Sequence, residues 1–145
     1  QKLVMNSTAQ GAIREFIKFA DYEDRAVSLI NEFFEAVRAV FGTEWVGMNP
    51  KTSRLRHGAG LIALGFVMEH LYATHNATTR DAFEPGLRLL RDKGHTAWTS
   101  GQWKLSEEDV RPWNGIQNTP SDIDLLSNHL VRSLRRELRR VQRDA

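Results

Sequence analysis

The chain has 145 residues, a length typical of one domain that buries roughly two-thirds of its unfolded surface. A hydrophobic fraction of 41% and a charged fraction of 26% are typical of globular proteins. The absence of cysteine excludes disulfides, thiolate metal sites and cysteine nucleophiles. The net charge of +2 is too small to indicate a nucleic-acid partner by itself, so the distribution of charge matters more than the total.

Targeting and membrane signals are weak throughout the chain. No apolar run approaches the ~18 residues that span a bilayer, and the longest candidate covers only residues 61–71. The chain begins at Gln1 and has no signal-peptide pattern. We expect a cytoplasmic protein without a membrane partner. Residues 1–9 are interpreted as a polar tail or linker, and residues 10–145 as a single helical domain, the C-terminal part of a longer protein.

The first forty residues predict two helices. Apolar residues recur at helical spacing over residues 10–20 and again over residues 21–41. Asp21 is expected to begin the second helix. Gly42 is placed to end that helix in a left-handed conformation.

A third helix is predicted from its N-cap Ser53 to about Tyr72. It is apolar nearly all round, which favours a central and buried position. Gly58, Gly60 and Gly65 each cost up to ~1 kcal/mol against alanine in a helix. We therefore expect these glycines to allow close approach of neighbouring backbones.

The second half of the chain predicts a fourth helix and then an irregular segment. Thr78 or Thr79 begins the helix, Pro85 breaks or kinks it, and Gly94 ends it. Residues 95–118 hold three of the four tryptophans and are expected to form a loop or a short hairpin, either of which could include a helical turn after Ser106. The tryptophans are better explained as core anchors than as platforms for stacking bases.

The last helix has the clearest start signal. Thr119 is its expected N-cap, Pro120 occupies the first helical position, and Asp122 can reach back from the third. Its apolar residues lie within about 120° of one another at helical spacing; they are Ile123, Leu126, Leu130, Leu134, Leu138 and Val141. The predicted fold class is all-α: a compact bundle of about five helices with a Trp-rich irregular segment before the last helix.

The outer face of that last helix is the best candidate for a functional surface. Residues 132–143 contain six arginines and one glutamate. The arginines are Arg132, Arg135, Arg136, Arg139, Arg140 and Arg143. A guanidinium group presents a bidentate donor fork suited to phosphate, so this face could contact a nucleic-acid backbone or an acidic partner. The alternative is a solvated face whose cations favour the negative end of the helix dipole.

A second basic patch lies near the start of the third helix. Lys51, Arg54 and Arg56 are added to the candidate nucleic-acid contacts because they lead into His57 and a glycine-rich helix start. Backbone N–H groups at a helix N-terminus can hold an anion. Neither nucleotide-binding glycine motif is present, however, so packing is the better explanation of the glycines.

Other residue types give no specific site. The five histidines form no i, i+4 pair and no HExxH motif, so we expect neither a metal nor a cofactor. Asn114, Gln117 and Asn118 have amides that can read base edges. Satisfying the loop backbone before the last helix is the favoured interpretation of these amides.

Several stretches together resemble the C-terminal helical region of the DGQHR-domain proteins, relatives of the DndB-type proteins linked to DNA phosphorothioation. They are Phe33-Phe34 with Val37, Phe41-Gly42-Thr43-Glu44-Trp45, the run from Ser53 to Met68, Trp98-Thr99-Ser100-Gly101-Gln102-Trp103, Trp113-Asn114, Gln117-Asn118-Thr119-Pro120, Asp122-Ile123 and Leu125-Leu126. The resemblance implies a bacterial or phage-encoded protein associated with DNA modification, restriction or phage defence. The family's naming motif belongs to a ParB-like N-terminal half and is absent here.

Three functions follow as hypotheses. The first is a non-catalytic helical domain that binds the DNA backbone or docks the protein's own N-terminal ParB-like half. The second is a protein-interaction domain, in which the last helix pairs with a partner or forms a homo-oligomer along its heptad-like seam. The third, least favoured, is an enzyme with a site in the region of His57 and Gly60.

Overall fold

The computed structural model describes the backbone of residues 9–145 and the side chains of residues 22–145. Its elements are α1 (Ala9–Val40), α2 (Gly42–Trp45), the 3-10 helix η1 (Arg54–Arg56), α3 (Gly58–His75), α4 (Arg80–Asp92), β1 (Gln102–Lys104), β2 (Val110–Pro112), the 3-10 helix η2 (Trp113–Gly115) and α5 (Pro120–Asp144). The predicted all-α class is confirmed, with one two-stranded hairpin within the described residues. The tail predicted for residues 1–9 lies outside the described residues except for Ala9, which begins α1.

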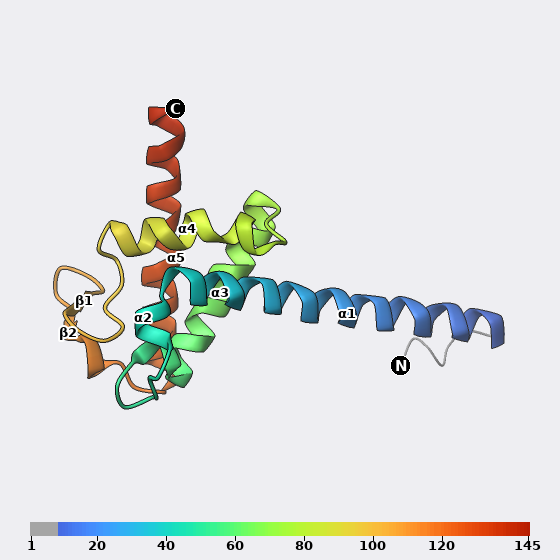
Figure 1. The fold of residues 1–145 in the computed structure, drawn as a ribbon, viewed down its shortest axis with the longest axis horizontal. Coiled ribbons are helices and arrows are strands. Elements are labelled where there is room, and N and C mark those ends of the chain that lie inside the picture. The colour runs from blue at the N-terminus through green and yellow to red at the C-terminus, as the bar shows by residue number, and fades with distance from the viewer. Residues whose placement is uncertain (1–8) are drawn as a thin grey trace.

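The body of the molecule is built on α3, α4 and α5. Helix α3 packs along α5, α4 packs against α5, and the second half of α1 packs on α4. Figure 1 shows that α1 extends far beyond this body and that the C-terminal end of α5 projects past α4. No described helix combines the length and apolar character needed to cross a membrane.

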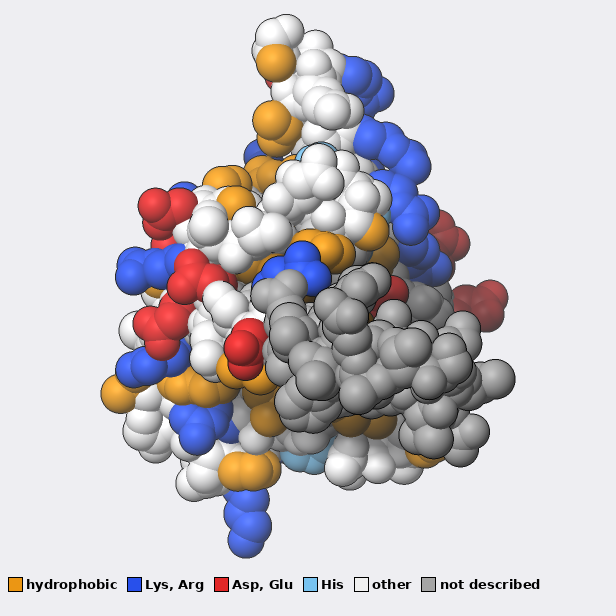
Figure 2. Space-filling model, turned by 90° about the vertical axis from the view of Figure 1, so that its right-hand side faces the viewer, with side chains coloured by type: hydrophobic (Ala, Val, Ile, Leu, Met, Phe, Trp, Pro, Cys, Tyr) orange, Lys and Arg blue, Asp and Glu red, His pale blue; other side chains and the backbone are white. Residues whose placement is uncertain are grey.

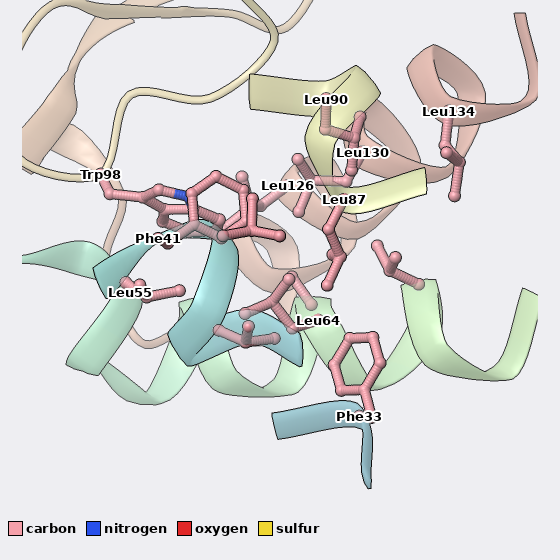
Figure 3. Packing of buried hydrophobic residues seen from close by; sticks show 14 of the residues in the cluster. Phe33, Phe41, Leu55, Leu64, Leu87, Leu90, Trp98, Leu126, Leu130 and Leu134 are labelled. Atoms are coloured by element: carbon pink, nitrogen blue, oxygen red, sulfur yellow. The ribbon is translucent and has the colours of Figure 1, made fainter. Parts of the chain in front are cut away.

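The core lies where leucines of these helices meet the tryptophan-rich segment. Leu64 of α3, Leu87 of α4 and Leu126 of α5 are fully buried and lie close together (Figure 3). Trp98 and Trp103 pack edge to face with ring centroids 5.0 Å apart, and both are buried. These two tryptophans are therefore core anchors, as the sequence predicted.

The predicted break at Asp21 is wrong, because α1 is one continuous helix. Neither glycine nor proline occurs between residues 12 and 40, and one aspartate inside a helix costs only a few tenths of a kcal/mol. The predicted left-handed cap at Gly42 is also wrong, since Gly42 begins α2. Within the described backbone, the positive φ angles belong instead to Gly47, Gly94 and Gly101, and to Asn76 after α3.

Helix α3 begins later and is more exposed than predicted. Ser53 caps η1 by accepting a hydrogen bond from the Leu55 N–H, whereas His57 caps α3. Ile62 and Phe66 are each 47% exposed, so the central burial predicted for the whole helix holds for only one side. The close approach predicted at Gly60 is confirmed, because a Cβ there would lie 1.9 Å from the Arg54 carbonyl oxygen.

Helix α4 continues through its proline. Thr79 is the N-cap, accepting a hydrogen bond from the Ala82 N–H, and the predicted break at Pro85 does not occur. Pro85 is exposed, so water can reach the carbonyl group that its missing N–H leaves unbonded. Phe83 and Leu87 on the opposite side are fully buried and hold the helix in place.

The irregular segment contains the hairpin that was one of its two predicted forms. Strands β1 and β2 pair antiparallel, with Trp103 opposite Arg111. The helical turn considered after Ser106 is not formed there; a 3-10 turn occurs instead at η2, directly after β2. The Trp103 indole N–H donates to the Trp113 carbonyl at 3.1 Å, which ties the hairpin to η2.

Candidate nucleic-acid interface

The start of α5 is fastened to the hairpin. Thr119 Oγ1 accepts a hydrogen bond from the Asp122 N–H at 3.3 Å, so the predicted N-cap is confirmed. The Asp122 carboxylate does not reach back to Thr119; it accepts from the Gln117 N–H at 2.8 Å and from Arg111 at 2.7 Å. The Arg111 guanidinium, followed by the Gln117 N–H, lowers the pKa of Asp122. This ion pair fixes where α5 begins relative to β2.

The apolar side of α5 is buried as far as its fourth turn. Leu126, Leu130 and Leu134 are fully buried, Leu138 is half-buried, and Val141 is 50% exposed. The seam proposed for pairing α5 with another helix is therefore occupied by the protein's own core through Leu134. The same packing presents the opposite side of α5 to solvent.

Six exposed arginines make up that opposite side, which we call the arginine face. It consists of Arg132, Arg135, Arg136, Arg139, Arg140 and Arg143. Basic side chains form a column along one edge of the projecting helix in Figure 2. From first to last the arginines span eleven residue steps, or about 16 Å at 1.5 Å per residue.

Most of the arginine face has no partner inside the protein. Arg132 donates to the Leu105 carbonyl at 3.3 Å, and Arg140 contacts Glu137 at 3.3 Å. The other four, Arg135, Arg136, Arg139 and Arg143, have no hydrogen-bond or ion-pair partner within the part of the chain that the structure describes. Their donors are therefore available to a ligand.

The helix dipole does not account for this face. A favourable interaction between a cation and the dipole is limited to the last turn, and only Arg143 lies in that turn. Arg132 and Arg136 lie roughly two to three turns earlier. Like charges at i, i+4 instead destabilise a helix by about 0.2–0.5 kcal/mol per pair. If the arginine face were only solvated, most of its charges would therefore not stabilise the fold.

A cleft of about 560 Å³ opens beside the arginine face, where the end of α4, strand β1 and the middle of α5 meet. Its charged lining consists of Lys93, Lys104, Arg132 and Arg136, and no carboxylate lines it among the described residues. We call it the cationic cleft. Arg132 and Arg136 were predicted from the sequence as contacts, whereas Lys93 and Lys104 were not, because they come from elements distant from α5 in the chain.

The end of α4 shapes one wall of the cationic cleft. Gly94 adopts a φ of +76° beyond the end of the helix, as its predicted role requires. Its N–H donates to the Arg91 carbonyl, and the His95 N–H donates back to the Leu90 carbonyl at 2.9 Å. These two bonds form a Schellman motif. The motif reverses the chain and places His95 against α5.

Two histidines of the cleft are held through their Nε2 atoms. His95 Nε2 lies 2.7 Å from Glu137 Oε2, and His129 Nε2 lies 2.9 Å from the His95 carbonyl oxygen. A carbonyl oxygen only accepts, so His129 carries its proton on Nε2. The hydrogen bond from His95 lowers the pKa of Glu137, which is only 2% exposed, and so keeps it ionised. Burial lowers the pKa of His129; the hydrogen bond to the His95 carbonyl oxygen opposes this shift, whereas the electrostatic effects of His95, Arg132 and Arg136 add to it.

The second predicted patch is engaged within the fold. Arg54 donates to the carbonyl groups of Pro50, Asn114 and Ile116 at 2.8, 2.8 and 2.9 Å. Arg56 donates to the Trp45 carbonyl at 3.2 Å and lies 4.5 Å from the centre of the Trp45 ring. Both guanidinium groups anchor loops, and Lys51 is the exposed cation of the patch. The structure does not bring this patch together with the arginine face into one surface.

The start of α3 is also occupied by the protein itself. His57 Nδ1 accepts from the Ala59 N–H at 3.2 Å, so one of the donors expected to hold an anion is already bonded. Burial, followed by the charge of Arg54, lowers the pKa of His57. Among the described residues, no three histidine, aspartate or glutamate side chains gather in a way that could hold a metal ion.

The three amides before α5 are exposed. Within the described residues, the side chains of Asn114, Gln117 and Asn118 form no hydrogen bond that would satisfy the loop backbone. Asn118 instead lies against Gly58, where a Cβ would be 2.9 Å from its Nδ2. The predicted backbone role is thus replaced by a packing contact for Asn118.

No protein-family model, curated protein or solved structure was found to match the chain. The resemblance to DGQHR-domain proteins therefore stays a prediction. A function has to be inferred from the arginine face of α5 and the adjoining cationic cleft.

Proposed function

We propose that this chain binds the phosphate backbone of DNA through the arginine face of α5, as a non-catalytic helical domain. The observation that carries the proposal is the set of four arginines without partners in the described structure, on a helix whose other side is locked into the core. A rigid helix presents these charges without paying to order its own backbone at the moment of binding.

The chemistry of the face suits a row of phosphates. A guanidinium group donates two parallel hydrogen bonds to one phosphate, and each DNA strand carries a phosphate roughly every 3.4 Å along the helix axis. A cationic row about 16 Å long therefore meets several phosphates at once. Such contacts carry no sequence information, so we expect sequence-independent binding with a Kd of about 10⁻⁴ to 10⁻⁶ M at physiological salt.

The biological setting rests on the family resemblance alone. A role in DNA modification, restriction or phage defence belongs to the proposal, as does docking to a ParB-like half of the same protein. The arginine face supports backbone binding independently of that setting, because it requires only the charges of α5.

The test is fluorescence anisotropy of the chain with labelled duplex DNA over a series of salt concentrations. Four phosphate contacts predict a log–log slope of about −3 to −4. Replacing Arg135, Arg136 and Arg139 with glutamine should make the slope shallower by about three units. The matched control replaces Arg38, Arg80 and Arg88, which are exposed arginines paired with glutamates on α1 and α4. It removes the same charge, and equal losses in the two variants would refute a site on α5.

A second candidate function is self-association through α1. The apolar side of α1 begins in the core at Phe33 and continues toward the N-terminus through Ile30, the half-buried Leu29 and Tyr22. Ile30 is 44% exposed and Tyr22 is 65% exposed. Apolar surface that continues past the core is a feature of association sites. Sedimentation equilibrium should then show a mass that rises with concentration and returns to the monomer value in Ile30→Glu; a constant monomer mass would exclude it.

A further inference from the structure

We propose that the cationic cleft is a binding site for a phosphate monoester, such as the terminal phosphate of a nucleic-acid strand or of a nucleotide. The cleft is distinct from the backbone-binding face in shape and in composition, although Arg132 and Arg136 belong to both. Binding of a phosphate monoester does not depend on the proposed function. Only the choice of a DNA strand end over a free nucleotide rests on it.

Convergent positive charge indicates an anionic ligand. Lys93 comes from the end of α4, Lys104 from β1, and Arg132 and Arg136 from α5, so cations approach the cleft from three elements. No carboxylate lines the cleft among the described residues, and the nearby Glu137 is turned to His95 and Arg140. The charges in the cleft are therefore not balanced by its own walls.

The two histidines add fixed nitrogen atoms to the same wall. Both Nε2 atoms are engaged, that of His95 on Glu137 and that of His129 on the His95 carbonyl oxygen. The edge of the Trp103 ring packs against His129, with ring centroids 6.0 Å apart, which restrains the ring further. On each histidine the nitrogen without a partner among the described residues is Nδ1. The Nδ1 of neutral His129 carries a lone pair, so it can accept a hydrogen bond from a hydroxyl group of the ligand.

The shape and charge of the site favour a monoester over a backbone diester. A diester phosphate carries one charge and has a sugar on both sides, so a convex row of arginines suits it. A monoester carries a charge of about −1.5 to −2 near neutral pH and has three terminal oxygens. It can enter a concave site from one end and accept hydrogen bonds from several directions. Four cations around one cleft match this ligand.

The test compares a set of phosphate probes with the full 145-residue chain. Calorimetric titration with inorganic phosphate and with adenosine monophosphate measures binding of a free monoester. Anisotropy with one oligonucleotide carrying a phosphate at its 5′ end, at its 3′ end or at neither end measures recognition of a strand end. A preference of roughly tenfold for a phosphorylated end corresponds to about one charge-assisted hydrogen bond.

Two double variants separate the cleft from the arginine face. Lys93→Gln with Lys104→Gln removes two exposed cations of the cleft that lie outside α5. Arg135→Gln with Arg139→Gln removes the same charge from α5 residues that do not line the cleft. We expect the lysine variant to lose the tenfold preference and free-monoester binding while keeping the salt slope. The arginine variant should lose part of the salt slope and keep the preference.

The outcomes are distinct. Binding of adenosine monophosphate that disappears in the lysine variant supports the cleft even if the chain fails to bind unphosphorylated DNA, in which case only the proposed function fails. A preference for a phosphorylated end without binding of the mononucleotide assigns the site to strand ends. The inference is overturned if no probe shows a preference for a monoester, or if both double variants reduce the preference equally.

Discussion

Helices α4 and α5 each carry three long charged side chains at a spacing of four residues, but the charges alternate in sign on α4 and have the same sign on α5. On α4, Glu84 lies between Arg80 and Arg88 at a spacing of four residues and pairs with both, at 2.8 and 2.6 Å. On α5, Arg139 lies between Arg135 and Arg143 at the same spacing. One helix neutralises its outer face, whereas the other accumulates like charges.

The stability of the fold explains the charged surface of α4 but not that of α5. The hydrogen bonds from both arginines lower the pKa of Glu84, as expected for an acid used to stabilise a helix. On α5 the single glutamate of the arginine-rich half, Glu137, faces His95 as well as Arg140. Repulsion along α5 is a cost to the folded state, and an external polyanion would relieve it.

The largest expected effect is on the free energy of unfolding, to which the buried faces of α4 and α5 should contribute equally. Leu87 of α4 and Leu130 of α5 are both fully buried. Replacing either with alanine should reduce the free energy of unfolding by about 2–5 kcal/mol, because each leaves a cavity in the same core. Chemical denaturation measures both values. A cost below about 1 kcal/mol for Leu130→Ala would mean that α5 is loosely held. The arginine face would then not be presented by a rigid helix.

The next effect is a pH dependence centred on the buried side of α5. Burial lowers the pKa of His129 below its ordinary value of 6.5, so the folded state binds fewer protons than the unfolded state there. The contribution of His129 to the free energy of unfolding is therefore fully present above pH 6.5 and is lost as the pH falls below that value. The lowered pKa values of Glu137 and Asp122 add losses of the same sign at lower pH, below about 4.5 and 3.8.

The variant His129→Gln checks this origin. Glutamine keeps an N–H donor for the His95 carbonyl but does not titrate. The cationic and titratable groups around His129 are His95, Arg132 and Arg136, all of which stay in place. Thermal unfolding between about pH 7.5 and pH 5.5 should show a shallower decline in the variant. His57 and His70 contribute losses of the same sign, so an unchanged decline would assign the dependence to them.

Local signals in the sequence predicted much of the fold. The Thr119-Pro120 start of α5, the start of α4 at Thr78 or Thr79 and its end at Gly94 each depend on a few neighbouring residues, and all three are confirmed, with Thr79 as the N-cap of α4. Asp21 shows the limit of such signals, because a capping residue inside a continuous apolar pattern does not have to end a helix.

The site was predictable only in part, because its geometry depends on contacts between distant segments. The exposure of the arginine face followed from spacing alone. The role of Arg54 did not, since its acceptors at Asn114 and Ile116 lie 60 and 62 residues away. The cationic cleft was missed for the same reason: His95 meets His129 and Glu137 across 34 and 42 residues. Periodicity within one helix carries no information about such pairings.

The smallest expected effect is the sharpest test of the contrast between the two helices. Arg139→Glu would give α5 the charge order of α4, with one acid between two arginines. At low salt this should raise the free energy of unfolding by roughly 0.8–2 kcal/mol, since two repulsive i, i+4 pairs become attractive. A loss about half as large is expected for Glu84→Gln on α4, because that change removes two attractive pairs without creating repulsive ones. High salt should shrink both changes.

If the arginine face is a binding surface, Arg139→Glu should also weaken DNA binding while it stabilises the protein, so that stability and binding move in opposite directions. A variant that is less stable and binds equally well would show that the arginines of α5 serve the fold.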